Sequence, residues 1–225
     1  MIKKETLTKN DVIELEITDF TSEGSGVGHK NGMAVFVAGA APGDTVECVI
    51  IKTKNNYAVG KITNVVKASP DRVTPDCRVF PRCGGCAFRH ITYEAELKMK
   101  QKRVSDAVTR IGHIDLAPCE IVASPSEKHY RNKAQYPVAV NGGRLLTGFY
   151  APFSHRVIDC KTCLLQPEGF AQILRTVARW VEKYKVSVYD EAKHTGLLRH
   201  IYIRKAFSTG ETMVCCCFVG KRQAD

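Results

Sequence analysis

The sequence has no apolar run that approaches the roughly eighteen residues needed by a membrane-spanning helix. Its opening stretch, MIKKETLTKNDVIELEI, contains lysines but no apolar segment followed by small residues, so it lacks the pattern of a secretory signal peptide. Internal repeats and low-complexity segments are also absent. These absences argue against a membrane or secreted protein and predict a cytoplasmic one, where disulfides are rare.

Positive charge is concentrated in the C-terminal half of the chain. The 225 residues carry 33 Lys and Arg against 23 Asp and Glu, a net charge of +10. Residues 1–70 hold eight basic and eight acidic side chains, whereas residues 121–225 hold sixteen basic and eight acidic ones. A polyanion such as RNA would therefore be attracted mainly by the C-terminal half, although charge alone fits a generally basic surface equally well.

The first seventy residues are predicted to form a small β-barrel. Ile13, Leu15 and Ile17 alternate with polar residues, as in a strand with one buried face. Three more strands are expected in the stretches MAVFVAG, TVECVIIKTK and YAVGKITNVV. Short strands separated by turn residues are typical of small barrels, and two prolines, Pro70 and Pro75, mark the end of this domain.

The glycine-rich stretch SEGSGVGHKNG, residues 22–32, is predicted to be a loop. Gly24, Gly26 and Gly28 resemble part of a nucleotide-binding fingerprint, which requires a helix immediately afterwards. The sequence returns at once to a strand pattern instead, so nucleotide binding is not assigned here.

The rest of the chain mixes helices with hairpins, so the predicted fold class is α+β with more than one domain. A helix is expected from Thr92 to Gly112, and a second, with a long apolar face, after Pro167. Two antiparallel hairpins are predicted, HYRNKAQYPVAV with RLLTGFY around the turn NGG, and LLRHIYIRKAF with TMVCCCFVG. Four parts are predicted: a barrel (1–70), a cysteine segment (71–91), a connecting helix (92–118) and a central mixed α/β domain (119–225). The central domain completes the cysteine site.

Ten cysteines in a reducing compartment indicate metal ligands or catalytic thiols before disulfides. Cys77, Cys83 and Cys86 lie within ten residues, and Cys160 and Cys163 form a distant Cys-x-x-Cys pair. Four thiolates suit either tetrahedral zinc or an iron–sulfur cluster. The long gap between the groups is unlike a zinc ribbon and favours a cluster, while the spacing leaves open which of the distant pair is a ligand.

The other five cysteines are predicted to fill the core. In a strand, Cys215 and Cys217 point to one face and Cys216 to the other, so the three do not converge on one ion. Cys48 and Cys119 have no cysteine partner at a useful spacing, and free cysteine packs as a small apolar residue.

The stretch CRVFPRCGGCAFRHITYEAELKMKQ closely resembles the cluster segment of bacterial iron–sulfur 23S rRNA uracil-5-methyltransferases. HYRNKAQYPV and VIDCKTCLLQPE resemble two further stretches of that family, in the same order. Residues 1–70 resemble the TRAM domain, an oligonucleotide-binding-type barrel that these enzymes carry at the N-terminus. This position disfavours methylthiotransferases, in which the domain lies at the C-terminal end.

The resemblance implies a 4Fe–4S cluster, and it selects Cys163 rather than Cys160 as the distant ligand. The implied ligands are Cys77, Cys83, Cys86 and Cys163. It also implies that 23S rRNA is the partner, bound by the TRAM domain and the central domain.

Several cations of the central domain are candidates for this RNA contact. Arg131, Lys133 and Gln135 share one face of a predicted strand, where they could meet phosphates and bases. A solvated strand face is the alternative from the pattern alone, and the resemblance favours RNA binding. Arg199 and Arg204 on the second hairpin are candidates of the same kind. Candidate base-stacking aromatics are Phe88, Tyr130 and Phe149, each of which also fits a core position.

The resemblance further implies parts that this sequence does not show. In the family, a cysteine nucleophile, a base and a Rossmann-like sheet that binds S-adenosylmethionine lie in a C-terminal domain. The present sequence contains no strand–glycine loop–helix unit and no cysteine in the nucleophile's motif. We therefore assign no catalytic or S-adenosylmethionine-binding residue, and expect the RNA-recognition and cluster-binding part of a methyltransferase that is inactive by itself.

In the family, the helix that matches residues 92–112 packs against the catalytic domain. Without that domain its apolar face should be exposed or covered by a second copy of the chain. The face consists of Tyr93, Leu97, Val104 and Val108. Two other functions stay open: a stand-alone RNA-binding module with a structural zinc site of four cysteines, and a small redox protein, which the basic surface and the barrel disfavour.

Overall fold

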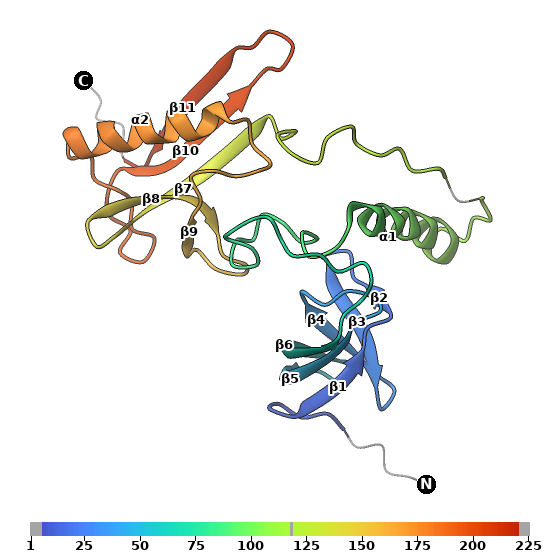
Figure 1. Ribbon diagram of the computed structural model, residues 1–225. Coiled ribbons are helices and arrows are strands. Elements are labelled where there is room, and N and C mark those ends of the chain that lie inside the picture. Colours follow the sequence, from blue (N-terminus) through green and yellow to red (C-terminus); the bar gives the residue numbers. More distant parts are fainter. Residues whose placement is uncertain (1–5, 118, 221–225) are drawn as a thin grey trace. The chain divides into compact units, whose positions relative to one another are not determined.

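The computed structural model describes residues 6–117 and 119–220, which form two compact units (Figure 1). The first unit comprises Met1–Asp76 and Cys86–Ala123, and the second comprises Cys77–Gly85 and Ser124–Asp225. Residues 1–5, 118 and 221–225, which belong to the predicted barrel, connecting helix and central domain, lie outside the described residues. Within the described part, no helix is long and apolar enough to cross a membrane.

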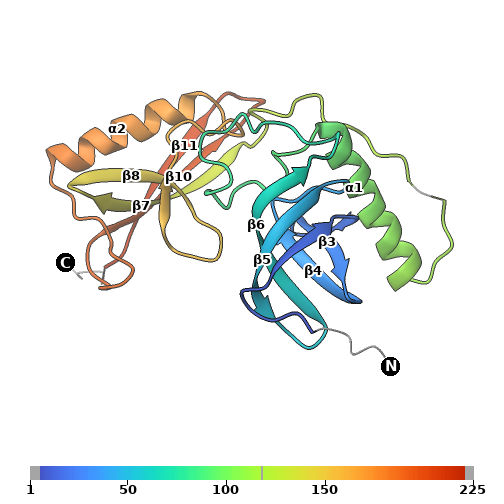
Figure 2. The same ribbon diagram turned by 60° about the horizontal axis from the view of Figure 1, so that its bottom comes forward.

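The first unit contains a six-stranded sheet with the order β1-β5-β6-β4-β3-β2. Its strands are β1 (Val12–Glu16), β2 (Asp19–Phe20), β3 (Ser25–Lys30), β4 (Met33–Ala38), β5 (Thr45–Thr53) and β6 (Tyr57–Lys67). All neighbours are antiparallel except β4 and β6. Since only two residues separate β1 from β2, one bent strand pairs with β5 at one end and with β3 at the other, which closes a small barrel (Figures 1 and 2).

The predicted strand alternation is confirmed in β1 and beyond it. Leu15 and Ile17 are almost fully buried, and Ile13 packs against the same core. That core also contains Val35 and Val37 of β4. Alternation predicts this arrangement because successive side chains of a strand point to opposite faces, and one face lines the barrel.

The prediction of a loop at residues 22–32 is wrong, because Ser25–Lys30 forms β3 and pairs with β4. The glycines are explained by packing rather than by a turn. A Cβ at Gly26 would lie 2.8 Å from side-chain atoms of Ala40 and Ile17, and one at Gly28 would collide with the Glu16 carbonyl. This strand therefore needs glycine where the bent strand crosses closely over it.

Beside the barrel, the buried carboxylate of Asp44 connects three segments of the first unit. Its oxygens accept the backbone N–H groups of Ala41 (2.6 Å) and Ser69 (2.8 Å) and the Nε–H of Arg72 (3.0 Å). Burial acts to raise the pKa of Asp44, but the Arg72 guanidinium and the two N–H groups outweigh it and hold the pKa below its ordinary value. The negative charge is therefore part of the folded state.

Replacing Asp44 with asparagine should destabilise the first unit by about 3 kcal/mol, because it leaves Arg72 without its charged partner. Since the folded pKa is lowered, the stabilisation is present above the unfolded pKa and disappears as pH falls through the folded one. Urea unfolding followed by circular dichroism at pH 7 and near pH 3 would measure this. The exposed Glu14→Gln change is the matched control, and an equal effect of both variants would refute the prediction.

The predicted helix at 92–112 is confirmed. The Thr92 side chain caps α1 (Tyr93–Asp106) by accepting the Ala95 N–H, and the helix continues as the π-helical turn η1 (Ala107–Ile111). The face that packs contains Ala95 and Met99. Of the apolar side predicted to be exposed, Val104 is 54% exposed, whereas Leu97 and Val108 are half-buried. Self-association through this helix stays a prediction.

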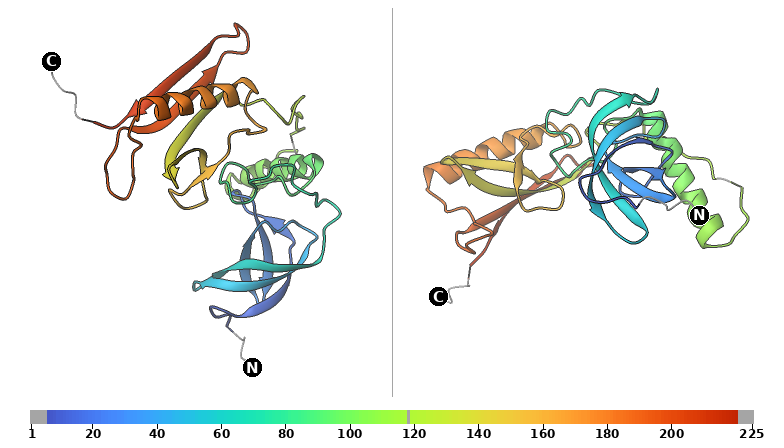
Figure 3. Two further views of the ribbon diagram at one scale, coloured as in Figure 1. Left: turned by 60° about the vertical axis from the view of Figure 1, so that its left-hand side comes forward. Right: turned by 90° about the horizontal axis from the view of Figure 1, so that it is seen from below.

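The second unit is a five-stranded antiparallel sheet with one helix on it. The strand order is β11-β10-β7-β8-β9. The strands are β7 (Lys133–Asn141), β8 (Arg144–Tyr150), β9 (Val157–Asp159), β10 (Leu198–Lys205) and β11 (Thr212–Phe218). The helix α2 (Gly169–Lys183) lies along one face, where Phe170 and Leu174 pack on Tyr136, Ile201 and Ile203 (Figures 2 and 3).

Both predicted hairpins are confirmed, one formed by β7 and β8 and the other by β10 and β11. In the first turn Gly142 and Gly143 have φ of +57° and +76°, which L side chains rarely adopt. Because α2 covers only one side of this sheet, strand alternation directs the remaining side chains to the opposite, open face.

Candidate metal centre and nucleic-acid interface

The segment Cys77–Gly85 forms a tight turn that is attached to the end of β8. The Phe80 N–H donates to the Cys77 carbonyl (3.2 Å), and the Cys83 N–H donates to the Val79 carbonyl (3.0 Å). The Gly84 N–H donates to the Tyr150 carbonyl (3.0 Å). A Cβ on Gly84 would lie 3.0 Å from that same oxygen, so glycine permits this close attachment.

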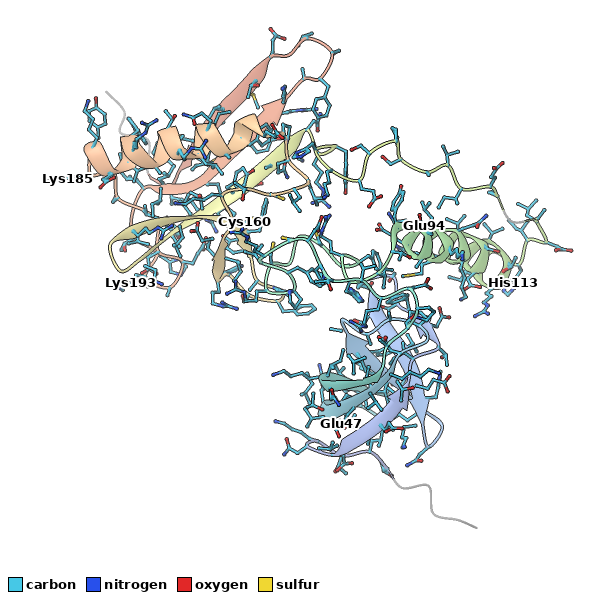
Figure 4. The ribbon with its side chains drawn as sticks, in the orientation of Figure 1. Glu47, Glu94, His113, Cys160, Lys185 and Lys193 are labelled. Atoms are coloured by element: carbon cyan, nitrogen blue, oxygen red, sulfur yellow. The ribbon has the colours of Figure 1, made fainter. Side chains whose placement is uncertain are left out.

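The Cys-x-x-Cys pair begins where β9 ends, and Figure 4 labels Cys160 at this point. The Cys160 N–H donates to the Thr147 carbonyl of β8 (2.9 Å), which continues the β8–β9 pairing by one residue. Cys160 is buried and Cys163 is half-buried. The pair therefore lies on a loop whose start is held by the sheet.

The two thiols of this pair have opposite acidities. A hydrogen bond from the Cys160 thiol lowers the pKa of Cys163 to about 6, and burial acts in the opposite direction. The backbone N–H groups of Leu165 and Gln166 and the charge of Arg131 also favour the thiolate. The same hydrogen bond raises the pKa of Cys160. The hydrogen bond therefore favours ionisation of Cys163 over that of Cys160.

The thiols of the two segments are neighbours. Burial raises the pKa of Cys83, and the negative charges of Cys163 and Cys77 raise it further. Cys77 and Cys83 are likewise close enough to Cys160 to act to raise its pKa. The fold of the second unit therefore brings together Cys77 and Cys83 with a pair that is far away in sequence.

Backbone N–H groups are directed at two of these sulfur atoms. The Gly85 N–H donates to Cys83 Sγ (3.4 Å), and N–H groups point at Cys163, as expected for groups that stabilise thiolate ligands. Across residues 6–117 and 119–220, however, no three Cys, His, Asp or Glu side chains converge as they would around a bound ion. Cys86, the remaining predicted ligand, belongs to the first unit.

The segment just before β7, which contains Arg131, is hydrogen-bonded to the loop that follows Cys163. The Arg131 N–H donates to the Leu165 carbonyl (2.9 Å) and the His129 N–H to the Leu164 carbonyl (2.9 Å). Gln166 is buried, and in the orientation that satisfies its amide the nitrogen donates to the carbonyls of Arg131 (3.1 Å) and Lys133 (3.2 Å). Sequence reasoning missed Gln166. The available signal was a polar residue within the otherwise apolar stretch LLQP.

The predicted alternation of β7 is confirmed. Lys133 and Gln135 are exposed, while Ala134 and Tyr136 are buried against the core below α2. Arg204 of β10 lies directly opposite Lys133 on the same open face. Arg131 precedes the strand and is also exposed, with its guanidinium carbon 6.0 Å from the centroid of the Tyr130 ring.

Arg199 differs from the other candidate cations because it is already engaged within the second unit. Its Nε donates to Glu191 Oε1 (2.8 Å) and its Nη2 to Glu191 Oε2 (3.1 Å). The guanidinium carbon also lies 5.2 Å from the centroid of the Tyr189 ring. These contacts give Arg199 a structural role in holding the segment before β10.

Of the candidate stacking aromatics, Tyr130 is 50% exposed. Phe88 and Phe149 are only half-buried but pack in the cores of their units. Tyr202 of β10, which sequence reasoning did not select, lies on the open face beside Lys133. The sequence did contain a signal for this: Tyr202 stands between Ile201 and Ile203, so in a strand its side chain points away from the face that these two bury.

The other cysteines divide into core and surface positions. Cys48 is buried in the barrel core and Cys216 packs against the core of the second unit, as predicted. The prediction is wrong for Cys119 and Cys215, which are exposed. Cys215 is exposed because it lies in β11, an edge strand, on the face opposite the helix.

Known proteins resemble both the barrel and the rest of the chain. The family model of the TRAM domain matches residues 7–63. A Clostridium tetani protein named an uncharacterized RNA methyltransferase is 42% identical over 214 residues, covering 95% of this chain and 46% of the relative. A protein of the same description from Halalkalibacterium halodurans is 42% identical over 209 residues, covering 92% of this chain and 46% of the relative.

The fold also matches a solved structure. This is the Pyrococcus abyssi tRNA (uracil-54, C5)-methyltransferase in complex with S-adenosyl-L-homocysteine, with a TM-score of 0.67 and 23% identity, covering 94% of this chain and 47% of that one. The protein therefore contains a TRAM domain, at residues 7–63, and a second unit built on a sheet. More particularly, the chain is homologous to RNA methyltransferases and spans about half the length of the curated relatives it matches.

Proposed function

We propose that this chain is the RNA-recognition and cluster-binding part of a cytoplasmic 23S rRNA uracil-5-methyltransferase. The observation that supports the proposal is that Cys77 and Cys83 lie near enough to Cys163 to influence one another's pKa, in a chain homologous to RNA methyltransferases. Cys86 completes the proposed 4Fe–4S ligand set. S-adenosylmethionine would be bound outside this chain and supply the methyl group for uridine C5.

The proposed role of this chain's own residues is to bind and orient RNA. Arg131, Lys133 and Arg204 supply cations, and Gln135 supplies an amide that can reach base edges. The hydrogen bonds of Gln166 tie the Arg131–Lys133 backbone to the Cys163 loop. A cluster on that loop would hold the cations in place, which gives the metal a positioning role.

A zinc-binding RNA module is the second candidate. It is favoured by Cys160, which lies among the other thiols of the second unit, so that Cys77, Cys83, Cys160 and Cys163 could form a four-thiolate zinc site without Cys86. Absorbance of anaerobically purified protein, with iron, sulfide and zinc measured on the same sample, decides between them. Equal iron and sulfide with a band near roughly 400 nm supports the cluster. A colourless protein with stoichiometric zinc overturns it.

RNA binding is predicted to depend on the open face of the second unit. Replacing Lys133 with glutamine should weaken binding to 23S rRNA fragments and lower the slope of log K against log salt by about 0.7, because one phosphate contact is lost. Lys133 is a cleaner choice than Arg131, which also acts on Cys163. Filter binding over a series of salt concentrations, with tRNA as competitor, measures both quantities.

Arg179→Gln provides the matched control, since Arg179 is an exposed cation on α2, on the other side of the sheet. Equal losses in both variants would mean that binding follows net charge and not this face. Tighter binding of tRNA than of 23S rRNA would contradict the proposed substrate.

A further inference from the structure

The open face of the second unit's sheet has an aromatic ring at its centre. Tyr202 of β10 lies opposite Gln135 of β7 and opposite Cys215 of β11. Two pairs further along, and so on the same face, Lys133 lies opposite Arg204. The Nζ of Lys133 is 6.0 Å from the centroid of the Tyr202 ring, so a cation borders the ring on this face.

This group is open to solvent and its charge is of one sign. Lys133, Gln135, Arg204 and Cys215 are exposed and Tyr202 is half-exposed, while α2 covers the opposite side of the sheet. The sequences of β7, β10 and β11 contain no acidic residue. In the described loops, Glu191 pairs with Arg199, and the exposed Glu211 at the start of β11 accepts a hydrogen bond from Thr209 (2.9 Å). The face therefore suits an anionic ligand that also offers a flat, apolar surface.

From this arrangement we propose that Tyr202 is a stacking platform for an unpaired base of single-stranded RNA, an inference that rests on the proposed RNA-binding function. One base stacks on the exposed part of the ring, Lys133 and Arg204 contact the phosphates on either side, and the Gln135 amide lies within reach of the base edge. Duplex RNA keeps its bases stacked on one another, so it cannot offer a base to the ring. The platform thus selects single-stranded segments.

The test compares Tyr202→Leu with Tyr202→Phe, which keeps the ring. The probe is a labelled single-stranded RNA of about eight nucleotides, with a duplex of the same sequence as the second ligand, followed by fluorescence anisotropy. Tyr202→Leu should weaken single-strand binding about tenfold without changing the salt slope, while Tyr202→Phe binds as the wild type does. Duplex binding should be weak and insensitive to both changes.

A second measurement uses the unmodified chain, so that it does not depend on the folding of a variant. Single-stranded RNA containing 5-bromouridine should crosslink to Tyr202 on irradiation, and mass spectrometry identifies the attached residue. Wild-type affinity in Tyr202→Leu together with crosslinks elsewhere would overturn the platform while leaving the RNA-binding function intact. Failure of the chain to bind any RNA would instead overturn the proposed function, and the platform with it.

Discussion

Replacing Cys163 with serine is expected to remove most of the metal from the proposed site. In the structure the Cys160 hydrogen bond, backbone N–H groups and the charge of Arg131 all lower the pKa of Cys163. Serine has the same shape but does not ionise at neutral pH. The loss should exceed the roughly tenfold to hundredfold effect of removing an outer partner of a ligand. Iron, sulfide and zinc analysis of the purified variant measures it.

Two serine variants make this result specific. Cys119 is exposed and is not one of the proposed ligands, so Cys119→Ser should keep its full metal content. Cys160→Ser separates the two proposed sites, because it should spare a cluster bound through Cys163 but remove a zinc ion that uses both thiols. Retention of metal in Cys163→Ser would contradict the assignment of the distant ligand.

Replacing Gly148 with alanine is expected to destabilise the second unit by about 3 kcal/mol or more and to lower its metal content. Gly148 of β8 lies opposite Asp159 of β9. A Cβ at this position would overlap the Ile158 carbonyl and lie 2.7 Å from the Cys160 nitrogen. The two strands must therefore separate, at a cost typical of severe overpacking, and the start of the thiol loop moves with β9.

The only tryptophan of the chain, Trp180, lies in α2, so its fluorescence reports unfolding of the second unit. Urea unfolding of Gly148→Ala should show a lower midpoint in this signal. Gly169→Ala is the matched control, because a Cβ at Gly169 meets nothing within 4 Å, and its midpoint should be unchanged or slightly higher. Equal midpoints for the two variants would show that β8 and β9 tolerate separation.

Much of the fold was predictable because the signals are local. Alternation predicted β1 and the outward direction of Lys133 and Gln135, and the NGG turn predicted the hairpin of β7 and β8. The helix at 92–112 was predictable from the helical spacing of its apolar residues and from Gly112 at its end. The prediction of a loop at residues 22–32 failed because its closely spaced glycines resemble a loop. Gly26 and Gly28 belong instead to β3, which needs glycine because another strand crosses it closely.

Some features of the candidate site were likewise readable from the sequence, whereas others required the folded structure. The sequence by itself determined the candidate residues, since the cysteine spacing and the positions of Arg131 and Lys133 are read directly from the chain. Only the tertiary structure decided that Cys160 lowers the pKa of Cys163 and that Gln166 ties the Arg131–Lys133 backbone to the loop of Cys163. It alone placed Tyr202 between Gln135 and Cys215 on an open face. These relations depend on hydrogen bonds and strand pairings between residues far apart in sequence, which only the folded sheet brings together.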